Sequence, residues 1–143
     1  MRTIRIKFPR LLLALWLVFT AIFGGLAEGA EGPLDIYLFW AEGCPHCANE
    51  MDFLKQWVAT ETRVQVHIYE VTREPASRAL YSSLVQYFGI QSPAVPFIVI
   101  GGRYIQGYDD AATTGEAIKA EVSRCLRTPC GDLVHWLQTG AGW

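Results

Sequence analysis

The stretch that decides the fold is Leu34–Cys47, which reads LDIYLFWAEGCPHC. Its first part, Leu34–Trp40, is a nearly continuous apolar and aromatic run, which is typical of a buried central strand. Ala41–Gly43 then makes a turn. The following segment, Cys44–Thr60, carries apolar residues at helical spacing and predicts a helix. Two cysteines separated by two residues therefore lie where a strand and turn give way to a helix.

The rest of the chain predicts a second strand–helix unit, a tight hairpin and a last helix. The expected elements are a strand at Val64–Val71, a helix from Pro75 to Gly89, strands at Phe97–Ile100 and Arg103–Gln106, a helix capped by Thr113 or Thr114, and a short amphipathic turn within Gly131–Trp143. Gly101-Gly102 between the two short strands indicates the hairpin. Two strands joined through a helix form a parallel pair. The order β-α-β-α-β-β-α therefore predicts an α/β fold, a four-stranded mixed sheet with flanking helices.

Length and composition indicate one globular domain. The chain has 143 residues, of which 51% are hydrophobic and 18% charged, and these proportions exclude a mostly disordered protein. No block of basic residues occurs after residue 10, so we do not expect a nucleic-acid binder.

Residues 1–27 have the pattern of a secretory signal. Met1–Arg10 carries four basic residues and no acid, and Leu11–Phe23 is almost wholly apolar. Gly25 and Ala27 then supply the small residues that precede a cleavage site. We therefore expect a signal peptide over residues 1–27, with an uncleaved membrane anchor as the alternative, and a folded domain over residues 28–143.

Export would change both the charge and the state of the cysteines. Cleavage removes four of the 12 basic residues and none of the 14 acidic ones, so eight basic residues remain and the net charge becomes −6. Disulfides persist outside the cytoplasm, so all four cysteines can be oxidised there. The expected location is the periplasm or another extracytoplasmic site across the inner membrane, as a free or membrane-anchored protein.

The tetrapeptide Cys44-Pro45-His46-Cys47 carries the strongest functional signal. A Cys-x-x-Cys pair between a first strand and a helix is typical of a redox site. Backbone N–H groups and the helix dipole stabilise a thiolate on Cys44, and Cys47 can attack the resulting mixed disulfide. Pro45 suits an early helical position because its missing N–H loses no bond there. A positive charge on His46 would favour the thiolate and make the pair a stronger oxidant.

Two other interpretations of this pair stay open. One is an inert structural disulfide. The other is half of a zinc site completed by Cys125 and Cys130, although their spacing is not that of a zinc ribbon. We expect no metal site, and we expect His67 to be a packed or surface residue of its strand.

Several segments carry a resemblance to the thioredoxin superfamily. Phe39–Cys44 resembles the strand and turn that lead into the active site of thioredoxins, and Cys44–Cys47 is the tetrapeptide associated with DsbA-type oxidants. Val95–Ile100 and Gly107–Asp110 are similar to the second half of glutaredoxins. From roughly Leu34 to Arg127 the chain therefore resembles a small, exported thioredoxin/glutaredoxin-like protein, and a thioredoxin-like fold is implied.

The resemblance implies that a substrate peptide binds beside the cysteines. Pro96 would follow a cis peptide bond and face the Cys pair. The backbone of Val95 would then pair with an extended substrate peptide, as an added strand does. An ordinary trans turn is the alternative.

The resemblance also raises the question of glutathione. Asp109-Asp110 matches the place where glutaredoxins hold the amino group of glutathione. However, Gln106 replaces the first glycine of the preceding pair, and Ala94 replaces the usual threonine before Val-Pro. A solvated acidic turn is the alternative, so glutathione binding stays open.

One residue implied by the resemblance is missing. Thioredoxins carry a buried aspartate for proton transfer six residues before the first active cysteine, where this chain has Leu38. Glu42 is expected to face solvent. Glu70 or water stays open as the replacement.

Cys125 and Cys130 form a second pair near the end of the last helix. The simplest interpretation is a structural disulfide, for which the chain-entropy estimate is about 2 kcal/mol in so short a loop. A second redox pair that relays electrons to Cys44–Cys47, or two free thiols, are the alternatives. The C-terminal end of a helix destabilises a thiolate, which disfavours the relay.

The expected function is an extracytoplasmic thiol:disulfide oxidoreductase acting on protein cysteines. Cys44 would exchange with substrate and Cys47 would resolve the mixed disulfide, assisted by Pro45, His46 and Pro96. Its partners would be protein thiols or disulfides and a redox protein, free or membrane-bound, and no cofactor is expected. A thiolate copper carrier and a non-catalytic domain with two disulfides are the alternatives, and the direction of exchange stays open.

Overall fold

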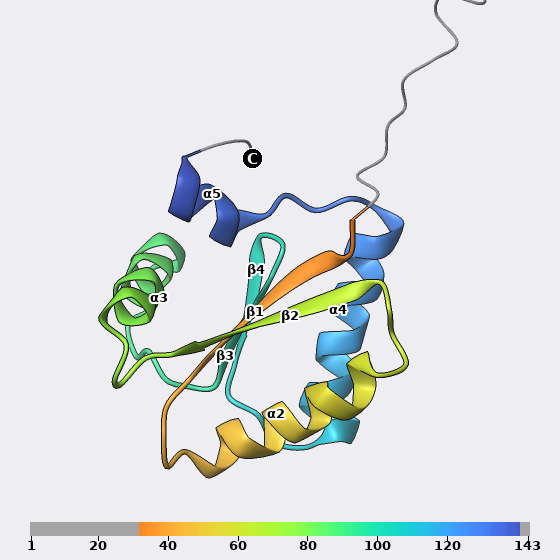
Figure 1. Cartoon of the computed structure of the whole chain (residues 1–143), viewed down its shortest axis with the longest axis horizontal. Coiled ribbons are helices and arrows are strands. Elements are labelled where there is room, and N and C mark those ends of the chain that lie inside the picture. The colour runs from red at the N-terminus through yellow and green to blue at the C-terminus, as the bar shows by residue number, and fades with distance from the viewer. Residues whose placement is uncertain (1–31, 141–143) are drawn as a thin grey trace, which may run out of the picture. The chain divides into compact units, whose positions relative to one another are not determined.

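A four-stranded mixed sheet runs through the centre of the folded domain (Figure 1). The computed structural model describes residues 32–140. Its strands are β1 (Leu34–Trp40), β2 (Val64–Glu70), β3 (Phe97–Ile100) and β4 (Arg103–Gln106), in the spatial order β2-β1-β3-β4. β1 pairs parallel with β2 and antiparallel with β3, and β4 is antiparallel to β3. The predicted α/β fold with a four-stranded mixed sheet is confirmed, although β2 ends one residue earlier than predicted.

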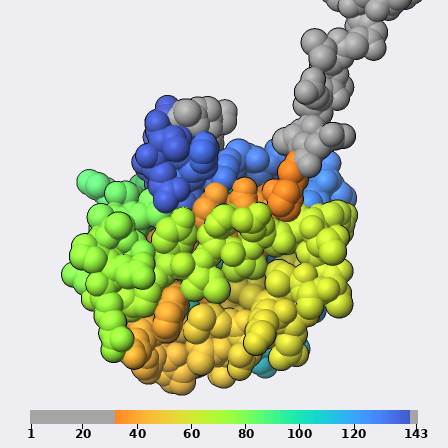
Figure 2. All heavy atoms as spheres, viewed as in Figure 1, coloured from red at the N-terminus to blue at the C-terminus, as the bar shows by residue number. Residues whose placement is uncertain are grey.

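Helices cover both faces of this sheet. They are α2 (Pro45–Val58), α3 (Pro75–Phe88), α4 (Glu116–Arg127) and α5 (Leu133–Thr139), and a short π-helical turn, η1 (Ala111–Gly115), precedes α4. α2 and α4 pack on one face, and α3 and α5 pack on the other. The edge strand β2 reaches the surface between α2 and α5 (Figure 2).

The start of the last long helix differs from the prediction. Neither Thr113 nor Thr114 is the capping residue. Instead, the carboxylate of Asp110 accepts hydrogen bonds from the backbone N–H of Thr113 at 2.8 Å and from its hydroxyl at 2.9 Å. The inserted turn η1 separates this acid from the apolar stripe of α4, so the usual spacing between cap and stripe does not apply.

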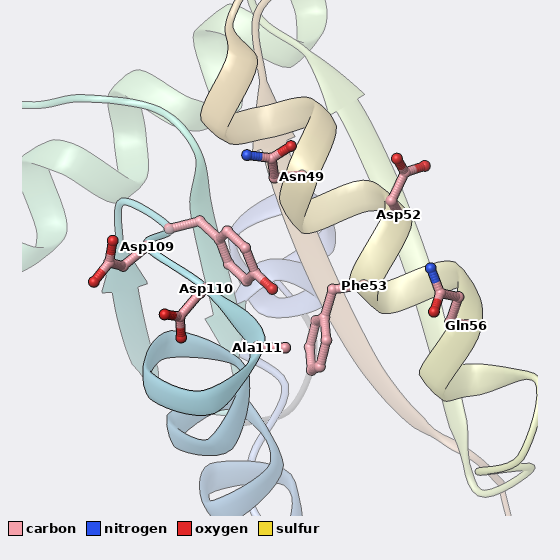
Figure 3. A pocket seen from close by; sticks show the side chains of 8 residues that line it. Asn49, Asp52, Phe53, Gln56, Asp109, Asp110 and Ala111 are labelled. Atoms are coloured by element: carbon pink, nitrogen blue, oxygen red, sulfur yellow. The ribbon is translucent and has the colours of Figure 1, made fainter.

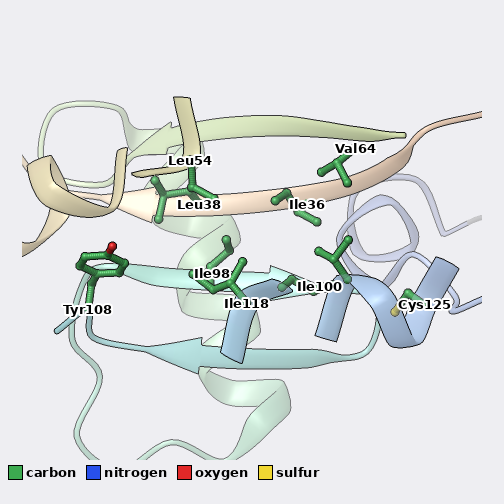
Figure 4. Packing of buried hydrophobic residues seen from close by; sticks show 10 residues of the cluster. Ile36, Leu38, Leu54, Val64, Ile98, Ile100, Tyr108, Ile118 and Cys125 are labelled. Carbon is green, nitrogen blue, oxygen red and sulfur yellow. The ribbon is translucent and has the colours of Figure 1, made fainter. Parts of the chain in front are cut away.

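Strand alternation divides the core into two clusters. On the α2–α4 face the sheet contributes Ile36, Leu38, Ile98 and Ile100, each at most 1% exposed (Figure 4). On the α3–α5 face it contributes Tyr37, Phe39, Phe97 and Val99. Truncating one such side chain to alanine typically lowers the free energy of unfolding by about 2–5 kcal/mol. Packing on both faces therefore holds the sheet, and the residues at its ends, in position.

The C-terminal helix α5 is held on the sheet by apolar packing and a hydrogen bond. Leu133 and Val134 are fully buried. The hydroxyl of Tyr37 donates a hydrogen bond to Asp132, the residue that caps α5, at 2.5 Å. The amphipathic turn predicted within residues 131–143 is therefore a helix, and residues 141–143 lie outside the described residues.

The register of β1 and β3 brings distant parts of the chain together. Phe39 near the end of β1 lies opposite Phe97 at the start of β3. The turn that follows β1 and the loop that precedes β3 therefore meet at the same end of the sheet. Cys44 lies in the first of these segments and Val95-Pro96 in the second.

The predicted signal peptide, residues 1–27, lies outside the described residues. Within residues 32–140, none of the helices has the length and apolar character needed to cross a membrane.

Candidate active site

Cys44 caps the N-terminus of α2. Its backbone is extended, with φ −86° and ψ 110°, and its Sγ accepts a hydrogen bond from the backbone N–H of Cys47 at 3.1 Å. Pro45 follows in the first turn of the helix, as predicted. Gly43 has φ 76°, a conformation that glycine adopts without strain. A sulfur in this position faces unpaired N–H groups and the positive end of the helix dipole, which stabilise a thiolate.

The two cysteines of the tetrapeptide form a disulfide but differ in exposure. Cys44 is bonded to Cys47. Cys44 is partly exposed, whereas Cys47 is 0% exposed. An incoming thiolate can therefore reach the disulfide only at Cys44, and Cys47 acts from inside the protein.

A cis proline lies against the disulfide. The Val95–Pro96 peptide bond is cis, as the resemblance implied. The carbonyl oxygen of Val95 lies 3.9 Å from Sγ of Cys44. Val95 is half-buried, while Pro96 is buried and packs the loop onto the start of β3. The backbone of Val95 is thus presented beside the reactive sulfur.

Gln106 holds the loop that carries this proline. Its side-chain oxygen accepts a hydrogen bond from the backbone N–H of Ala94 at 3.2 Å, and its amide nitrogen donates to the carbonyl of Ser92 at 3.1 Å. The hydroxyl of Tyr81 donates to the carbonyl of Ala94 at 3.1 Å, and the N–H of Gly107 donates to the carbonyl of Pro96 at 2.7 Å. These contacts fix the Val95–Pro96 segment from both sides. The departure from glycine at residue 106 therefore has a structural role that the sequence did not reveal.

Residues 36–105 match the family model of glutaredoxins. Among solved structures, the chain is similar to a protein from Agrobacterium tumefaciens, with 16% identity and a TM-score of 0.55 over 68% of this chain and 47% of that chain. The match therefore spans less than half of the Agrobacterium protein. The fold is thioredoxin-like.

Glutaredoxins themselves also appear among the similar structures. A complex of buckwheat glutaredoxin with glutathione has 22% identity and a TM-score of 0.47, covering 63% of this chain and 77% of that chain. Glutaredoxin from Archaeoglobus fulgidus has 20% identity and a TM-score of 0.45, covering 69% of this chain and 97% of that chain. No curated protein sequence matches the chain. The segment that matches the family model contains Cys44, Cys47 and the Val95–Pro96 bond, and the fold around them is thioredoxin-like.

His46 connects the start of α2 to the segment that precedes η1. Its Nδ1 lies 2.8 Å from the backbone carbonyl oxygen of Tyr108 and donates a hydrogen bond to it. The side chain is otherwise exposed, next to the disulfide in sequence. The tuning role of this residue stays a prediction, and the hydrogen bond shows how its ring is oriented.

The two acids considered for proton transfer lie at the surface. Glu42 is exposed and forms an ion pair with Arg73. The carboxylate of Glu70 accepts hydrogen bonds from the backbone N–H groups of Thr72, at 2.9 Å, and Arg73. The sulfur of Cys47 is fully buried, and none of these contacts joins Glu42 or Glu70 to it.

A buried acid that was not predicted from the sequence lies one turn beyond Cys47. Glu50 is 1% exposed and shares the buried face of α2 with Cys47 and Leu54. Burial raises the pKa of its carboxyl to about 8. The spacing in the sequence indicates this burial. Residues three and four apart on a helix share a face, and Glu50 lies between Cys47 and Leu54 in the apolar stripe.

A hollow of about 310 Å³ opens beside the site, between α2 and residues 108–111 (Figure 3). Its lining residues are Asn49, Asp52, Phe53 and Gln56 from α2, and Tyr108, Asp109, Asp110 and Ala111 from the other wall. The acids matched to the glutathione site thus form part of this wall. Both acids are exposed, and one oxygen of Asp110 is used by the cap of η1.

The second cysteine pair lies at the other end of β3. Cys125 and Cys130 are bonded, which is the pairing of the simplest interpretation. A Cβ atom at Gly101, just after β3, would lie 2.6 Å from Cβ of Cys130, so this disulfide packs tightly on the hairpin turn. Since Val95 precedes β3 and strands rise about 3.3 Å per residue, the two disulfides are on the order of 20 Å apart. At that separation the two disulfides do not touch each other.

Two further predictions concern a metal site and His67. Within residues 32–140, no group of three or more His, Cys, Asp or Glu side chains is placed to hold a metal ion. Nε2 of His67 lies 2.7 Å from the carboxylate of Asp35, and the imidazole stacks on Tyr37 at 4.9 Å between ring centroids. His67 is therefore a packed residue of β2, as predicted.

Proposed function

We propose that this chain is an extracytoplasmic thiol:disulfide oxidoreductase that exchanges disulfides with protein cysteines through Cys44 and Cys47. One observation carries the proposal: a partly exposed Cys44 caps α2, is bonded to a buried Cys47 and lies 3.9 Å from the carbonyl of Val95 before a cis proline. This arrangement combines an activated sulfur, a resolving sulfur and a backbone edge for substrate.

The reaction proceeds through a mixed disulfide. A substrate thiolate attacks Sγ of Cys44, the Cys44–Cys47 bond breaks, and Cys47 leaves and takes up a proton. A second substrate thiolate then attacks the substrate sulfur of the mixed disulfide, so that a substrate disulfide forms and Cys44 leaves as a thiolate. The substrate is oxidised and the cysteine pair is reduced. The same steps in reverse reduce a substrate disulfide.

The loop before β3 is the proposed substrate-binding edge. An extended peptide can pair with the backbone of Val95, which places a substrate sulfur next to Cys44. Pro96 and Gln106 keep this edge in position through the contacts described above. Protein thiols and disulfides are therefore the proposed substrates, and a further redox protein is needed to renew the pair.

Two features support a location outside the cytoplasm. Residues 1–27 have the pattern of a secretory signal. The second pair, Cys125–Cys130, is a disulfide that packs against a hairpin turn and has no part in the exchange site. Structural disulfides persist in oxidising compartments.

Insulin reduction and the reactivation of scrambled ribonuclease test the activity. The wild-type protein is expected to catalyse at least one of these reactions, and Cys44→Ser is expected to abolish the turnover. A Cys125→Ser/Cys130→Ser double variant is the matched control and should retain it. Equal turnover in wild type and Cys44→Ser would contradict the proposal.

The reduction potential of Cys44–Cys47 determines the direction of exchange. A potential near about −120 mV indicates an oxidant whose reduced form is stabilised, and one near about −270 mV indicates a reductase that depends on an electron supply. Mass spectrometry of the two cysteine pairs separates their titrations.

A further inference from the structure

The hollow between α2 and residues 108–111 has no task in the exchange steps described above. Its volume of about 310 Å³ is that of a small ligand site, so it has room for a side chain rather than for a whole peptide (Figure 3). Of the described residues that line it, three are aspartates, and none is a lysine, arginine or histidine. The lining is therefore strongly anionic.

The three aspartates have no opposite charge of their own. Within residues 32–140, none of Asp52, Asp109 and Asp110 forms an ion pair. The hydrogen bonds that Asp110 accepts from Thr113 lower the pKa of its carboxyl, so this group is charged at neutral pH. Carboxylates that share a site repel one another, and a cation placed among them relieves this repulsion.

Tyr108 adds a buried hydroxyl group without a partner. Its side chain lines the hollow and is only 7% exposed, and its hydroxyl forms no hydrogen bond with a described residue. Among residues 32–140, no completely shielded polar side-chain atom lacks a partner, so this hydroxyl has access to open space. Figure 4 shows it pointing toward α2, the opposite wall of the hollow. Its oxygen can accept a hydrogen bond from an ammonium or guanidinium group.

The aromatic part of the lining also suits a cation. The rings of Phe53 and Tyr108 lie 5.9 Å apart between centroids. Phe53 already contacts one cation of the chain, since Nζ of Lys119 lies 5.5 Å from its ring centroid. That ammonium group is paired with Glu116 at 2.9 Å, and Lys119 does not line the hollow. Ring faces attract cations at such distances, so rings and carboxylates favour the same kind of ligand.

The hollow lies within reach of a peptide that is bound at Cys44. The hydrogen bond from Nδ1 of His46 to the carbonyl of Tyr108, at 2.8 Å, joins the start of α2 to the wall of the hollow. With a rise of 1.5 Å per residue, Asn49 and Gln56 lie about 7 Å and about 18 Å along the helix from Cys44. An extended peptide advances about 3.3 Å per residue. A substrate residue about three to five positions from the reacting cysteine can therefore place its side chain in the hollow.

We propose that this hollow binds a basic side chain, arginine or lysine, of the substrate protein. The proposal rests on the exchange function proposed above and adds a preference for substrates with a basic residue about three to five positions from the reacting cysteine. An arginine fits best, because its guanidinium group stacks on a ring and pairs with a carboxylate through two N–H groups. Glutathione carries two carboxylates and one ammonium group at neutral pH, so its net negative charge opposes binding among the three aspartates.

Exchange with reporter peptides tests this preference. The peptides carry arginine, glutamine or glutamate at one position, three to five residues before or after a single cysteine. At the best position, kcat/KM of the wild type should be about tenfold higher for arginine than for glutamine, and this ratio should shrink in high salt. Asp52→Asn should reduce the ratio to about threefold. Asp35→Asn, the same change at the start of β1, is the matched control and should keep the wild-type ratio.

A charge reversal makes the test independent of the size of these effects. Asp52→Arg should prefer the glutamate peptide to the arginine peptide. Equal kcat/KM for the three residues at every position in the wild type would overturn the proposal. An unchanged preference in both Asp52→Asn and Asp52→Arg would also overturn it.

Binding without exchange separates the hollow from the reactive cysteine. The best arginine peptide, with serine in place of its cysteine, is titrated into the ¹⁵N-labelled oxidised protein and should shift the side-chain amide signals of Asn49 and Gln56. The absence of these shifts, or stronger binding of S-methylglutathione at the same signals, would overturn the assignment to a basic side chain. Failure of every cysteine peptide to form a mixed disulfide at Cys44 would instead overturn the exchange function.

Discussion

Gln106 shows what one side chain adds at a position where the resemblance to glutaredoxins would place glycine. Its amide group accepts from Ala94 and donates to Ser92, so it bridges two backbone groups of the loop before the cis proline. A glycine here would leave both groups to solvent. The proposed substrate-binding edge at Val95 is therefore held by a side chain from β4, the neighbouring strand.

The first prediction concerns this bridge. Gln106→Ala removes two hydrogen bonds, each worth about 1 kcal/mol, and lets the loop move away from Cys44. We expect kcat/KM for a protein substrate to fall by about tenfold, with the reduction potential of Cys44–Cys47 unchanged because the helix start is untouched. Gln65→Ala, the same change on the exposed face of β2, is the control and should leave both quantities at wild-type values. Unaltered kcat/KM in Gln106→Ala would show that the loop needs no such support.

The buried carboxyl of Glu50 predicts how stability depends on pH. Its pKa is raised from 4.5 to about 8 in the folded state, so between these values the folded state binds more protons than the unfolded state. The free energy of unfolding should therefore fall as pH rises from about 4.5 to about 8 and level off above that range. Denaturant titration of oxidised wild type and Glu50→Gln measures this directly: the wild-type value should fall by several kcal/mol more than that of the variant. Parallel curves for the two proteins would contradict the burial of Glu50.

Among the elements, β3 carries a distinct feature at each end. The cis Val95–Pro96 bond precedes it, next to the Cys44–Cys47 disulfide, and the turn after it touches the Cys125–Cys130 disulfide. All four residues of the strand are buried. This short central strand therefore connects the end of the sheet next to the Cys44–Cys47 disulfide with the end next to the Cys125–Cys130 disulfide.

The close packing of the hairpin turn on the Cys125–Cys130 disulfide predicts how a substitution of Gly101 affects stability. Gly101 has φ +57°, and a Cβ atom there would lie 2.6 Å from Cβ of Cys130 and 3.2 Å from Sγ of Cys125. Gly101→Ala must therefore displace the disulfide in addition to adopting an unfavourable backbone conformation, and we expect a loss of about 2–4 kcal/mol in the free energy of unfolding. Gly89→Ala has a similar φ of +66° but open space around the new Cβ, so it isolates the backbone contribution, about 1 kcal/mol. Equal losses in the two variants, measured by denaturant titration, would mean that the hairpin turn and the disulfide do not pack as described.

For the molecule as a whole, local patterns in the sequence predict most of the fold. The apolar run Leu34–Trp40, the Gly101-Gly102 hairpin and the helix-ending Gly89 all lie where predicted. These signals depend on neighbouring residues only, so they can be read from the chain. The cysteine pair at the start of α2 and the cis bond before Pro96 follow from recognisable motifs in the same way.

The features that the sequence did not reveal depend on contacts between distant residues. Asp110 caps η1 because a π-helical turn is inserted, and Gln106 reaches Ser92 and Ala94 only once β4 lies beside β3. Glu50 is buried because α2 packs its Cys47 face onto the sheet. Periodicity marks such an acid as unusual, but only the packed structure shows that it shares a buried face with Cys47.

Trapping the mixed disulfide is the most direct measurement of the proposed activity. Reduced Cys47→Ser, which attacks a substrate disulfide but cannot resolve the product, is mixed with insulin and analysed by peptide mass spectrometry, with Cys44→Ser as the control. We predict one stable adduct, joined to the substrate through Cys44 and absent from the control. No adduct, or an adduct confined to Cys125 or Cys130, would contradict the assignment of Cys44 as the exchanging sulfur.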